Sequence, residues 1–181
     1  RDLSMPSVRF EVRLLSREGK NALSASGADE VSFVMSANAG EALGPISRIA
    51  SGGELSRIML ALKNVFAEKD GVDALIFDEI DTGVSGVAAQ RVAEKLASLG
   101  RTKQVLCVTH LPQIAAMAQQ QYLVEKAEHG GRTYTNIRLL DREGRRYELA
   151  RLSGGDMITD IQLAGAEELL ARDERFRASL S

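Results

Sequence analysis

Two adjacent carboxylates, Asp78 and Glu79, directly follow the short apolar run at residues 74–77. Ligands of open α/β sheets bind outside the carboxyl ends of the strands, so acidic side chains placed there can do chemistry. An Asp can hold Mg²⁺, usually through water, because hard cations prefer oxygen ligands. The following Glu79 can polarise an attacking water as a general base. Taken alone, the pair fits equally well with solvated carboxylates that open a loop.

A second apolar run, at residues 105–108, ends in Thr109 and His110. The carboxyl ends of parallel strands meet at one edge of a sheet, so we expect His110 to lie at the same edge as Asp78 and Glu79. There it can donate a hydrogen bond to a phosphate oxygen or hold the attacking water. A single histidine is more often structural, but this position favours a functional one.

Four residues, Ser51-Gly52-Gly53-Glu54, stand immediately before an amphipathic pattern. Two glycines let the backbone approach a ligand closely. The start of a helix offers free N–H groups and the positive end of the helix dipole, which together suit an anion. Without other motifs, an ordinary helix cap with a glycine loop would explain the segment as well.

These residues need a framework of buried strands and flanking helices. The runs at 74–77 and 105–108 lack alternation, which is typical of parallel strands buried on both faces, and a helix at 87–99 would join them as a βαβ unit. Alternating residues at 8–14 and 31–35 predict two half-buried N-terminal strands, which we expect to be antiparallel. Other periodic segments predict helices at 54–67, 111–118 and 161–171, strands at 122–126 and 133–140, and a helical turn at 147–152. The predicted fold is α/β, a mostly parallel sheet flanked by helices.

The composition limits the classes of function that this chain can have. The 181 residues are about one domain. A formal net charge of -2 does not point to a dedicated nucleic-acid-binding domain. The single cysteine, Cys107, rules out a disulfide within the chain and fits a reducing compartment. No apolar run approaches the roughly 20 residues that span a bilayer, so we expect no membrane partner. The chain does not begin with Met, and we expect it to be a piece of a longer protein.

The order of the motifs resembles that of ATP-binding-cassette ATPase heads. Residues 51–57 resemble the signature motif, and residues 74–79 resemble Walker B with its catalytic glutamate. Residues 81–86 stand where the D-loop would be, and Thr109-His110 resembles the switch-histidine loop. Four motifs in this order are far more specific than any one of them.

The sequences of residues 50–57, 77–86 and 109–115 closely resemble those of the RecN family of bacterial DNA-repair and recombination proteins. That family belongs with the ATPases that resemble structural-maintenance-of-chromosomes (SMC) proteins. The resemblance implies a DNA double-strand-break repair ATPase. Its head is divided between the two ends of a longer chain, with a coiled coil between them.

The phosphate-binding Walker A loop, GxxxxGK[ST], is absent from the sequence. The resemblance places that loop in an N-terminal lobe, so residues 1–181 are expected to be the C-terminal head lobe only. Alone, this lobe should hydrolyse almost no ATP. The implied partners are its own N-terminal lobe, a second identical head and, through the full protein, DNA; the implied location is the cytoplasm, on the nucleoid.

The resemblance also implies roles for single residues. Asp78 would hold Mg²⁺, while Glu79 and His110 would be catalytic toward the ATP of their own protomer. The signature motif would contact the γ-phosphate held by the opposite protomer, and the D-loop would cross the interface between the two heads. The signature residues are Ser51, Gly52, Gly53 and Glu54, and the D-loop residues are Asp81, Gly83, Ser85 and Gly86.

Two alternatives remain open at the level of sequence. The first is a fragment of the nucleotide-binding subunit of an ABC transporter, which shares the order of motifs. The second is a non-catalytic module that only dimerises or binds a partner. A basic cluster of Arg142, Arg145, Arg146 and Arg151 is better interpreted as a solvated surface than as a DNA site.

Overall fold

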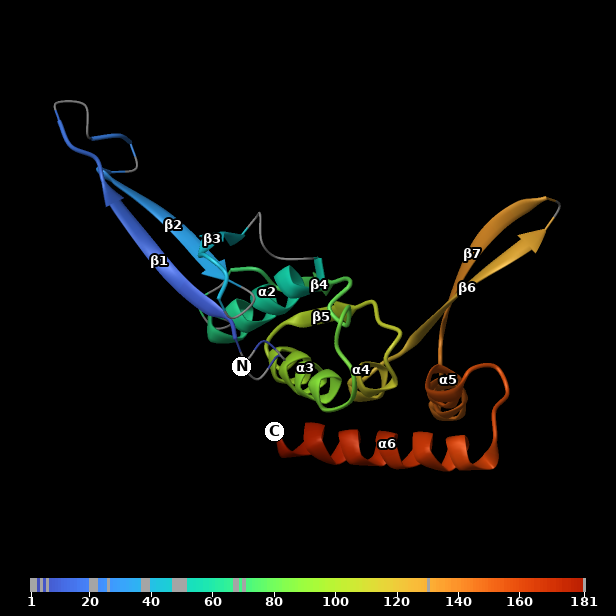
Figure 1. Ribbon diagram of the computed structural model, residues 1–181. Helices are drawn as coiled ribbons and strands as arrows, with labels where there is room; N and C mark the ends of the chain where they lie inside the picture. Colours follow the sequence, from blue (N-terminus) through green and yellow to red (C-terminus); the bar gives the residue numbers. More distant parts are fainter. Residues whose placement is uncertain are drawn as a thin grey trace.

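The computed structural model describes residues 3, 5, 7–19, 23–25, 27–36, 40–46, 52–66, 69, 71–129 and 131–180. A parallel pair of strands, β4 (Ala74–Phe77) and β5 (Gln104–Cys107), is joined by helix α3 (Gly86–Leu99). The predicted βαβ unit is therefore confirmed. Helix α2 (Gly52–Phe66) precedes it, and α4 (Pro112–Met117) follows β5 directly (Figure 1).

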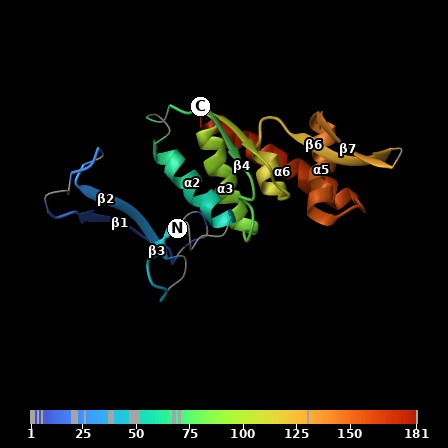
Figure 2. The same ribbon diagram turned by 90° about the horizontal axis from the view of Figure 1, so that it is seen from above.

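Two antiparallel hairpins extend from opposite ends of this central part, as both views show (Figures 1 and 2). The first consists of β1 (Arg9–Ser16) and β2 (Asp29–Ser36), and the two-residue strand β3 (Gly44–Pro45) pairs with β2. The second consists of β6 (Tyr122–His129) and β7 (Arg132–Leu139). Both hairpins confirm strands that the alternation predicted, and the α/β fold class with antiparallel N-terminal strands is confirmed.

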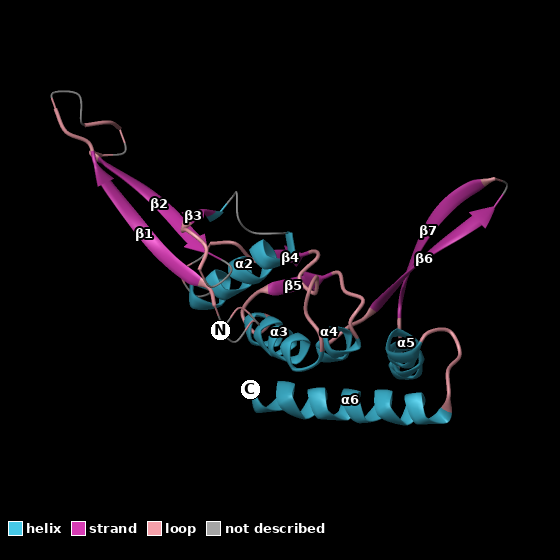
Figure 3. Ribbon diagram, in the orientation of Figure 1, coloured by secondary structure: helices cyan, strands magenta, loops and turns pink. Residues whose placement is uncertain are grey.

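Two C-terminal helices complete the fold, α5 (Arg142–Gly154) and α6 (Asp160–Ser179). Helix α6 runs beneath α3, α4 and α5 and contacts all three (Figure 3). Both helices are longer than predicted: α5 begins five residues before the predicted turn at 147–152, and α6 continues eight residues beyond the predicted end at residue 171. Asp141 accepts the N–H of Gly144 at 2.8 Å, and Thr159 and Gln162 form a reciprocal capping box.

The main core lies between the parallel strands and helices α2, α3 and α4. It contains Leu60, Phe77, Ile80, Val92 and Met117, with Leu75, Val105 and Cys107 packed against it. A second core lies between α4, α5 and α6, where Ala115, Ala116, Leu149, Ala150, Ala166 and Leu170 are buried. The first core therefore anchors β4 and β5, and the second anchors the helix that follows β5.

The expected burial of β4 and β5 on both faces is wrong within this chain. One face packs on the core, but Ile76 is 75% exposed and Val108 is 63% exposed on the other. The expected half-burial of β1 is wrong as well, because every residue of that strand is exposed. Alternation identifies an apolar face but cannot tell which other segment covers it.

Candidate nucleotide site at the carboxyl edge of the parallel strands

The parallel register brings the predicted chemical residues together. Phe77 pairs with Cys107, and the N–H of Val108 donates to the carbonyl of Phe77 at 2.9 Å. The segments that follow the two strands therefore leave the sheet side by side. Asp78 and Glu79 follow β4, and Thr109 and His110 follow β5. The predicted meeting of these residues at one sheet edge is confirmed.

The backbone of Glu79 is held in an unusual conformation. Its φ is 56°, the one positive value for a non-glycine residue in the parts of the chain that are described. Such a conformation is uncommon for residues with a side chain and costs on the order of 1–3 kcal/mol. It persists because the Asp78 carboxylate accepts the Glu79 N–H at 2.9 Å and the Glu79 carbonyl accepts the Thr82 N–H at 3.1 Å. Strain of this kind concentrates at functional sites.

The start of α2 packs directly against this turn. A Cβ atom on Gly52 would lie 2.5 Å from Oε2 of Glu79, and one on Gly53 would lie 2.9 Å from its carbonyl oxygen. Position 53 therefore requires glycine, because its neighbours are a Cβ atom and backbone oxygens, whereas the clash at position 52 is with the exposed end of the Glu79 side chain, which can move aside. Glu54 is half-buried in the first turn of the helix, whereas Ser51 lies outside the described residues. The motif glycines Gly52 and Gly53 thus lie directly beside Glu79.

Replacing Gly53 with Ala should lower the free energy of unfolding. The new methyl group would meet Cβ of Thr82 at 2.8 Å, and overpacking of this kind costs about 1–3 kcal/mol. The better helix propensity of Ala returns up to about 1 kcal/mol, so we expect a net loss of about 1–2 kcal/mol in urea unfolding. Gly165 in α6 is the matched control, because nothing lies within 4 Å of a Cβ there. Gly165→Ala should stabilise the chain; a stabilising Gly53→Ala would contradict the packing.

Two side chains of α2 that the sequence reasoning missed fasten the helix to the acidic turn. The Ser56 hydroxyl donates to the carbonyl of Asp78 at 2.9 Å. The Arg57 guanidinium is buried and donates to the carbonyls of Ile80 at 3.3 Å and Thr82 at 2.7 Å. Burial lowers the pKa of Arg57, and the nearby Glu54 charge opposes that shift. The spacing of Ser56 and Arg57 from the motif glycines is the only sequence signal that could have identified them.

Three of the predicted D-loop residues are exposed, and the fourth is buried. Gly83, Ser85 and Gly86 are exposed, and the two glycines adopt positive φ values of 73° and 51°. Ser85 is the N-cap residue of α3, yet its side chain makes no capping hydrogen bond. Asp81, by contrast, is only 4% exposed, and its carboxylate is engaged within the chain. Its predicted contact with a second head stays a prediction that no observation tests.

The acidic edge fits a magnesium ion only as part of a larger site. Within the described residues, no group of three or more His, Cys, Asp or Glu side chains could hold a metal ion. Mg²⁺ commonly takes one or two protein carboxylates, with nucleotide phosphates and water as its other ligands. The exposed carboxylate of Asp78 suits the first of these contributions. The residues present thus fit a metal that arrives with a nucleotide.

Cys107 lies on the core-facing side of β5, next to this edge. Burial raises the pKa of its thiol to about 12, and the negative charges of Asp81 and Asp78 add to the shift. Only the thiolate is alkylated, so the folded chain in Mg²⁺-free neutral buffer should react on the order of a thousandfold more slowly than the unfolded chain. Equal rates for the folded and urea-unfolded chain would contradict this placement. Its position is therefore that of a core residue rather than of a nucleophile.

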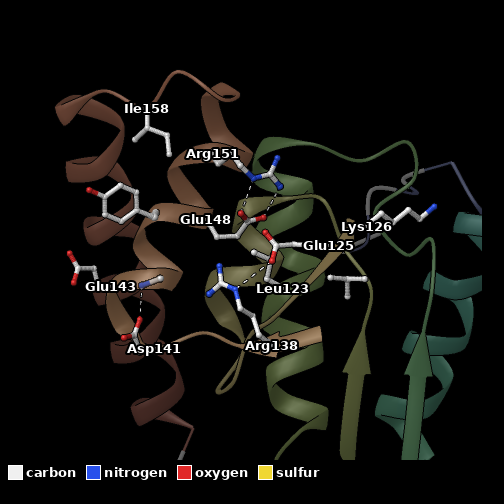
Figure 4. A pocket seen from close by; sticks show the side chains of 12 residues that line it. Leu123, Glu125, Lys126, Arg138, Asp141, Glu143, Glu148, Arg151 and Ile158 are labelled. Atoms are coloured by element: carbon white, nitrogen blue, oxygen red, sulfur yellow. Dashed lines mark hydrogen bonds and ion pairs between the residues drawn. The ribbon is translucent and has the colours of Figure 1, made fainter. Parts of the chain in front are cut away.

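A separate open groove lies between the β6–β7 hairpin and α5 (Figure 4). None of the predicted site residues lines it. Four of its charged side chains form two ion pairs: Arg151 with Glu148 at 2.7 Å and Arg138 with Glu125 at 3.5 Å. The basic cluster of the sequence analysis lies on the same helix. Its first member, Arg142, is neutralised by ion pairs with Glu167 and Glu174. Arg145 is buried, so the expectation of a solvated position is wrong for this residue.

Sequence comparison identifies close relatives along nearly the whole chain. It is 46% identical to DNA repair protein RecN of Halalkalibacterium halodurans over 171 residues, and 41% identical to that of Bacillus subtilis over 178 residues. Each match covers 94% of this chain but only 30% and 31% of the relative, respectively. No protein-family model matches the chain. The predicted resemblance to RecN is confirmed, and the chain spans about 30% of the length of these relatives.

The fold also resembles a solved structure. The SMC head domain with a coiled coil and joint derived from Pyrococcus yayanosii has a TM-score of 0.55 at 20% identity, covering 84% of this chain and 27% of that one. This likeness shows that the chain shares its fold with part of an SMC head domain. In the described parts of the chain, no helix is both long and apolar enough to cross a membrane.

Proposed function

We propose, for a chain similar to RecN DNA-repair proteins over nearly all of its length, that residues 1–181 form the signature-bearing lobe of a divided ATPase head. One observation carries the proposal above all. The register of β4 and β5 gathers Asp78, Glu79 and His110 at one sheet edge, with Gly52 packed against Glu79. The Walker A loop that this edge lacks would come from a separate N-terminal lobe.

In the completed head, each residue at the edge has its own task. Glu79 would take a proton from the attacking water as the general base. His110 would contact that water or a γ-phosphate oxygen. Asp78 would hold Mg²⁺, which supplies neutralising charge to the phosphate oxygens when it is bound. The reaction is hydrolysis of ATP to ADP and phosphate.

The signature motif would act on a second head. Gly52, Gly53 and Glu54 begin α2, where free N–H groups and the helix dipole attract an anion. Together with Ser51 they would contact the γ-phosphate held by the opposite protomer. The exposed Gly83, Ser85 and Gly86, and the backbone near Asp81, would cross the interface. ATP would then hold two identical heads together, and hydrolysis would remove the contacts that they share.

The exposed apolar surface supports the missing lobe as the first partner. Ile76, Leu106 and Val108 leave one face of the parallel strands uncovered. Phe10 and Phe33 stack with ring centroids 5.8 Å apart on the β1–β2 hairpin, and both are about half exposed. Faces of this kind are normally buried against another layer. A Walker A lobe packed against these faces would bury them.

For the whole protein we propose a role in DNA double-strand-break repair and recombination, in the cytoplasm and on the nucleoid. The name of its relatives supports DNA repair. An ABC transporter subunit is not favoured, because the reported relatives are repair proteins. A non-catalytic module is not favoured either, because the strained Glu79 and the gathered carboxylates serve no evident structural purpose.

Mixing this chain with the Walker A lobe of the same protein tests the divided head. The mixture should form a stable complex by size-exclusion chromatography and bind a fluorescent ATP analogue with Mg²⁺, whereas neither lobe alone should bind it appreciably. Hydrogen exchange at β4 and β5 should slow in the complex, since their uncovered face becomes buried. Two well-folded lobes that never associate would contradict the proposal.

A further inference from the structure

The buried carboxylate of Asp81 connects the ends of the two parallel strands. Its Oδ2 accepts the Thr109 hydroxyl at 2.6 Å and the backbone N–H of His110 at 2.9 Å, and it lies 3.0 Å from Nδ1 of the His110 ring. The Thr109 hydroxyl oxygen in turn accepts the N–H of Leu111 at 3.1 Å. One oxygen atom therefore determines both the backbone and the ring orientation of His110.

The chemistry of this contact determines which ring nitrogen carries the proton. Two acceptors only 3.0 Å apart would repel each other, so the contact between Nδ1 and the Asp81 carboxylate favours a proton on Nδ1. In a neutral imidazole the other nitrogen, Nε2, is then an acceptor. The His110 side chain is 72% exposed, and no hydrogen bond within the described part of the chain involves Nε2. Asp81 thus contacts the ring at Nδ1, and the acceptor Nε2 lies on the exposed side of the ring.

We propose that Asp81 is a positioning residue that fixes His110 as the Nδ1–H tautomer and aims Nε2 at the nucleotide edge. The catalytic part of this inference rests on the proposed ATPase function; the tautomer does not. The fixed tautomer separates the two tasks open to His110. A neutral ring accepts a hydrogen bond from the attacking water, whereas donation to a γ-phosphate oxygen requires the imidazolium form.

The burial of Asp81 suits a role of its carboxylate within its own chain. A side chain that is 4% exposed offers little surface to a partner, while Gly83, Ser85 and Gly86 are exposed. Carboxylates that hold a metal-ligating histidine through its second nitrogen fix the tautomer and the ring orientation, and their loss typically costs about 10–100-fold in metal affinity or activity. The same magnitude is expected here.

The tautomer can be measured on this chain without any nucleotide. The sequence contains only two histidines, His110 and His129, so a His129→Gln variant assigns the ring signals of His110 in ¹⁵N NMR. In the neutral ring we expect Nδ1 to be protonated in the folded chain. Asp81→Ala, which removes the acceptor, should release His110 toward the Nε2–H tautomer. A predominantly Nε2–H ring in the wild-type chain would overturn the proposal, even if the variant failed to fold.

The catalytic part is tested in the head completed with its Walker A lobe. Asp81→Ala should lower kcat about 10–100-fold and leave KM for ATP nearly unchanged. In a His110→Ala background the same change should have little further effect, because Asp81 acts through the ring. An equal loss with and without His110 would refute the positioning role. If the completed wild-type head did not turn over ATP, the proposed function would fail while the tautomer result would still decide the role of Asp81.

Discussion

Glu79→Gln in a completed head should lower ATP turnover about 10²–10⁴-fold, the usual contribution of a general base. Gln keeps the shape of the side chain and the backbone conformation but cannot take a proton from water. The position at the end of β4, the left-handed φ of 56° and the contact with Gly52 all place this carboxylate at the nucleotide edge. Steady-state phosphate release measures the effect.

The same variant should still bind ATP and pair with a second head, because those contacts come from other residues. Glu168→Gln is the matched control, since Glu168 is an exposed carboxylate on α6 that lines none of the site. It should turn over ATP at the wild-type rate. Wild-type turnover by Glu79→Gln would mean that another group activates the water, and failure of Glu79→Gln to pair would assign the residue to assembly.

Arg145→Met should cause the largest loss of stability among the changes considered. The guanidinium of this buried residue donates to the carbonyls of Ala115, Ala116, Ala118 and Gln119 and to the side chain of Gln121, at distances from 2.8 to 3.5 Å. These carbonyls lie at the carboxyl end of α4, where a helix leaves its last acceptors unpaired. Burial lowers the pKa of Arg145, and the positive charge of Arg177 adds to that shift.

Each buried acceptor left without a partner costs about 1–3 kcal/mol, so we expect Arg145→Met to lower the free energy of unfolding by about 2–4 kcal/mol in urea. The total is less than the sum because Arg177 also donates to the carbonyls of Ala116 and Met117. Arg142→Met provides the control, since Arg142 is an exposed arginine on the same helix and should change the midpoint little. Similar losses for both variants would contradict the assigned role of Arg145.

More of the site than of its surroundings could be predicted from the sequence. Apolar runs that end in Asp78-Glu79 and Thr109-His110 identify parallel strands, and parallel register then brings their carboxyl ends together without further information. The buried state of Asp81 and Arg145 could not be predicted in this way. Their partners lie 26–30 residues away for most contacts, and a charged residue in a turn or helix is ordinarily solvated.

The apolar faces show a second limit of sequence reasoning. Alternation correctly predicts β1 and β2, and the continuous runs correctly predict β4 and β5. Neither pattern tells which segment covers an apolar face, and Ile76 and Val108 remain exposed in this chain. The pattern therefore points to a surface that requires a partner, which the proposed N-terminal lobe would provide.

ATP turnover by this chain, by its Walker A lobe and by their mixture tests the divided head most directly. The account predicts turnover only in the mixture, because the general base and the phosphate-binding loop lie in different lobes. Turnover by this chain alone would show that it contains a phosphate-binding loop of its own and would contradict the account.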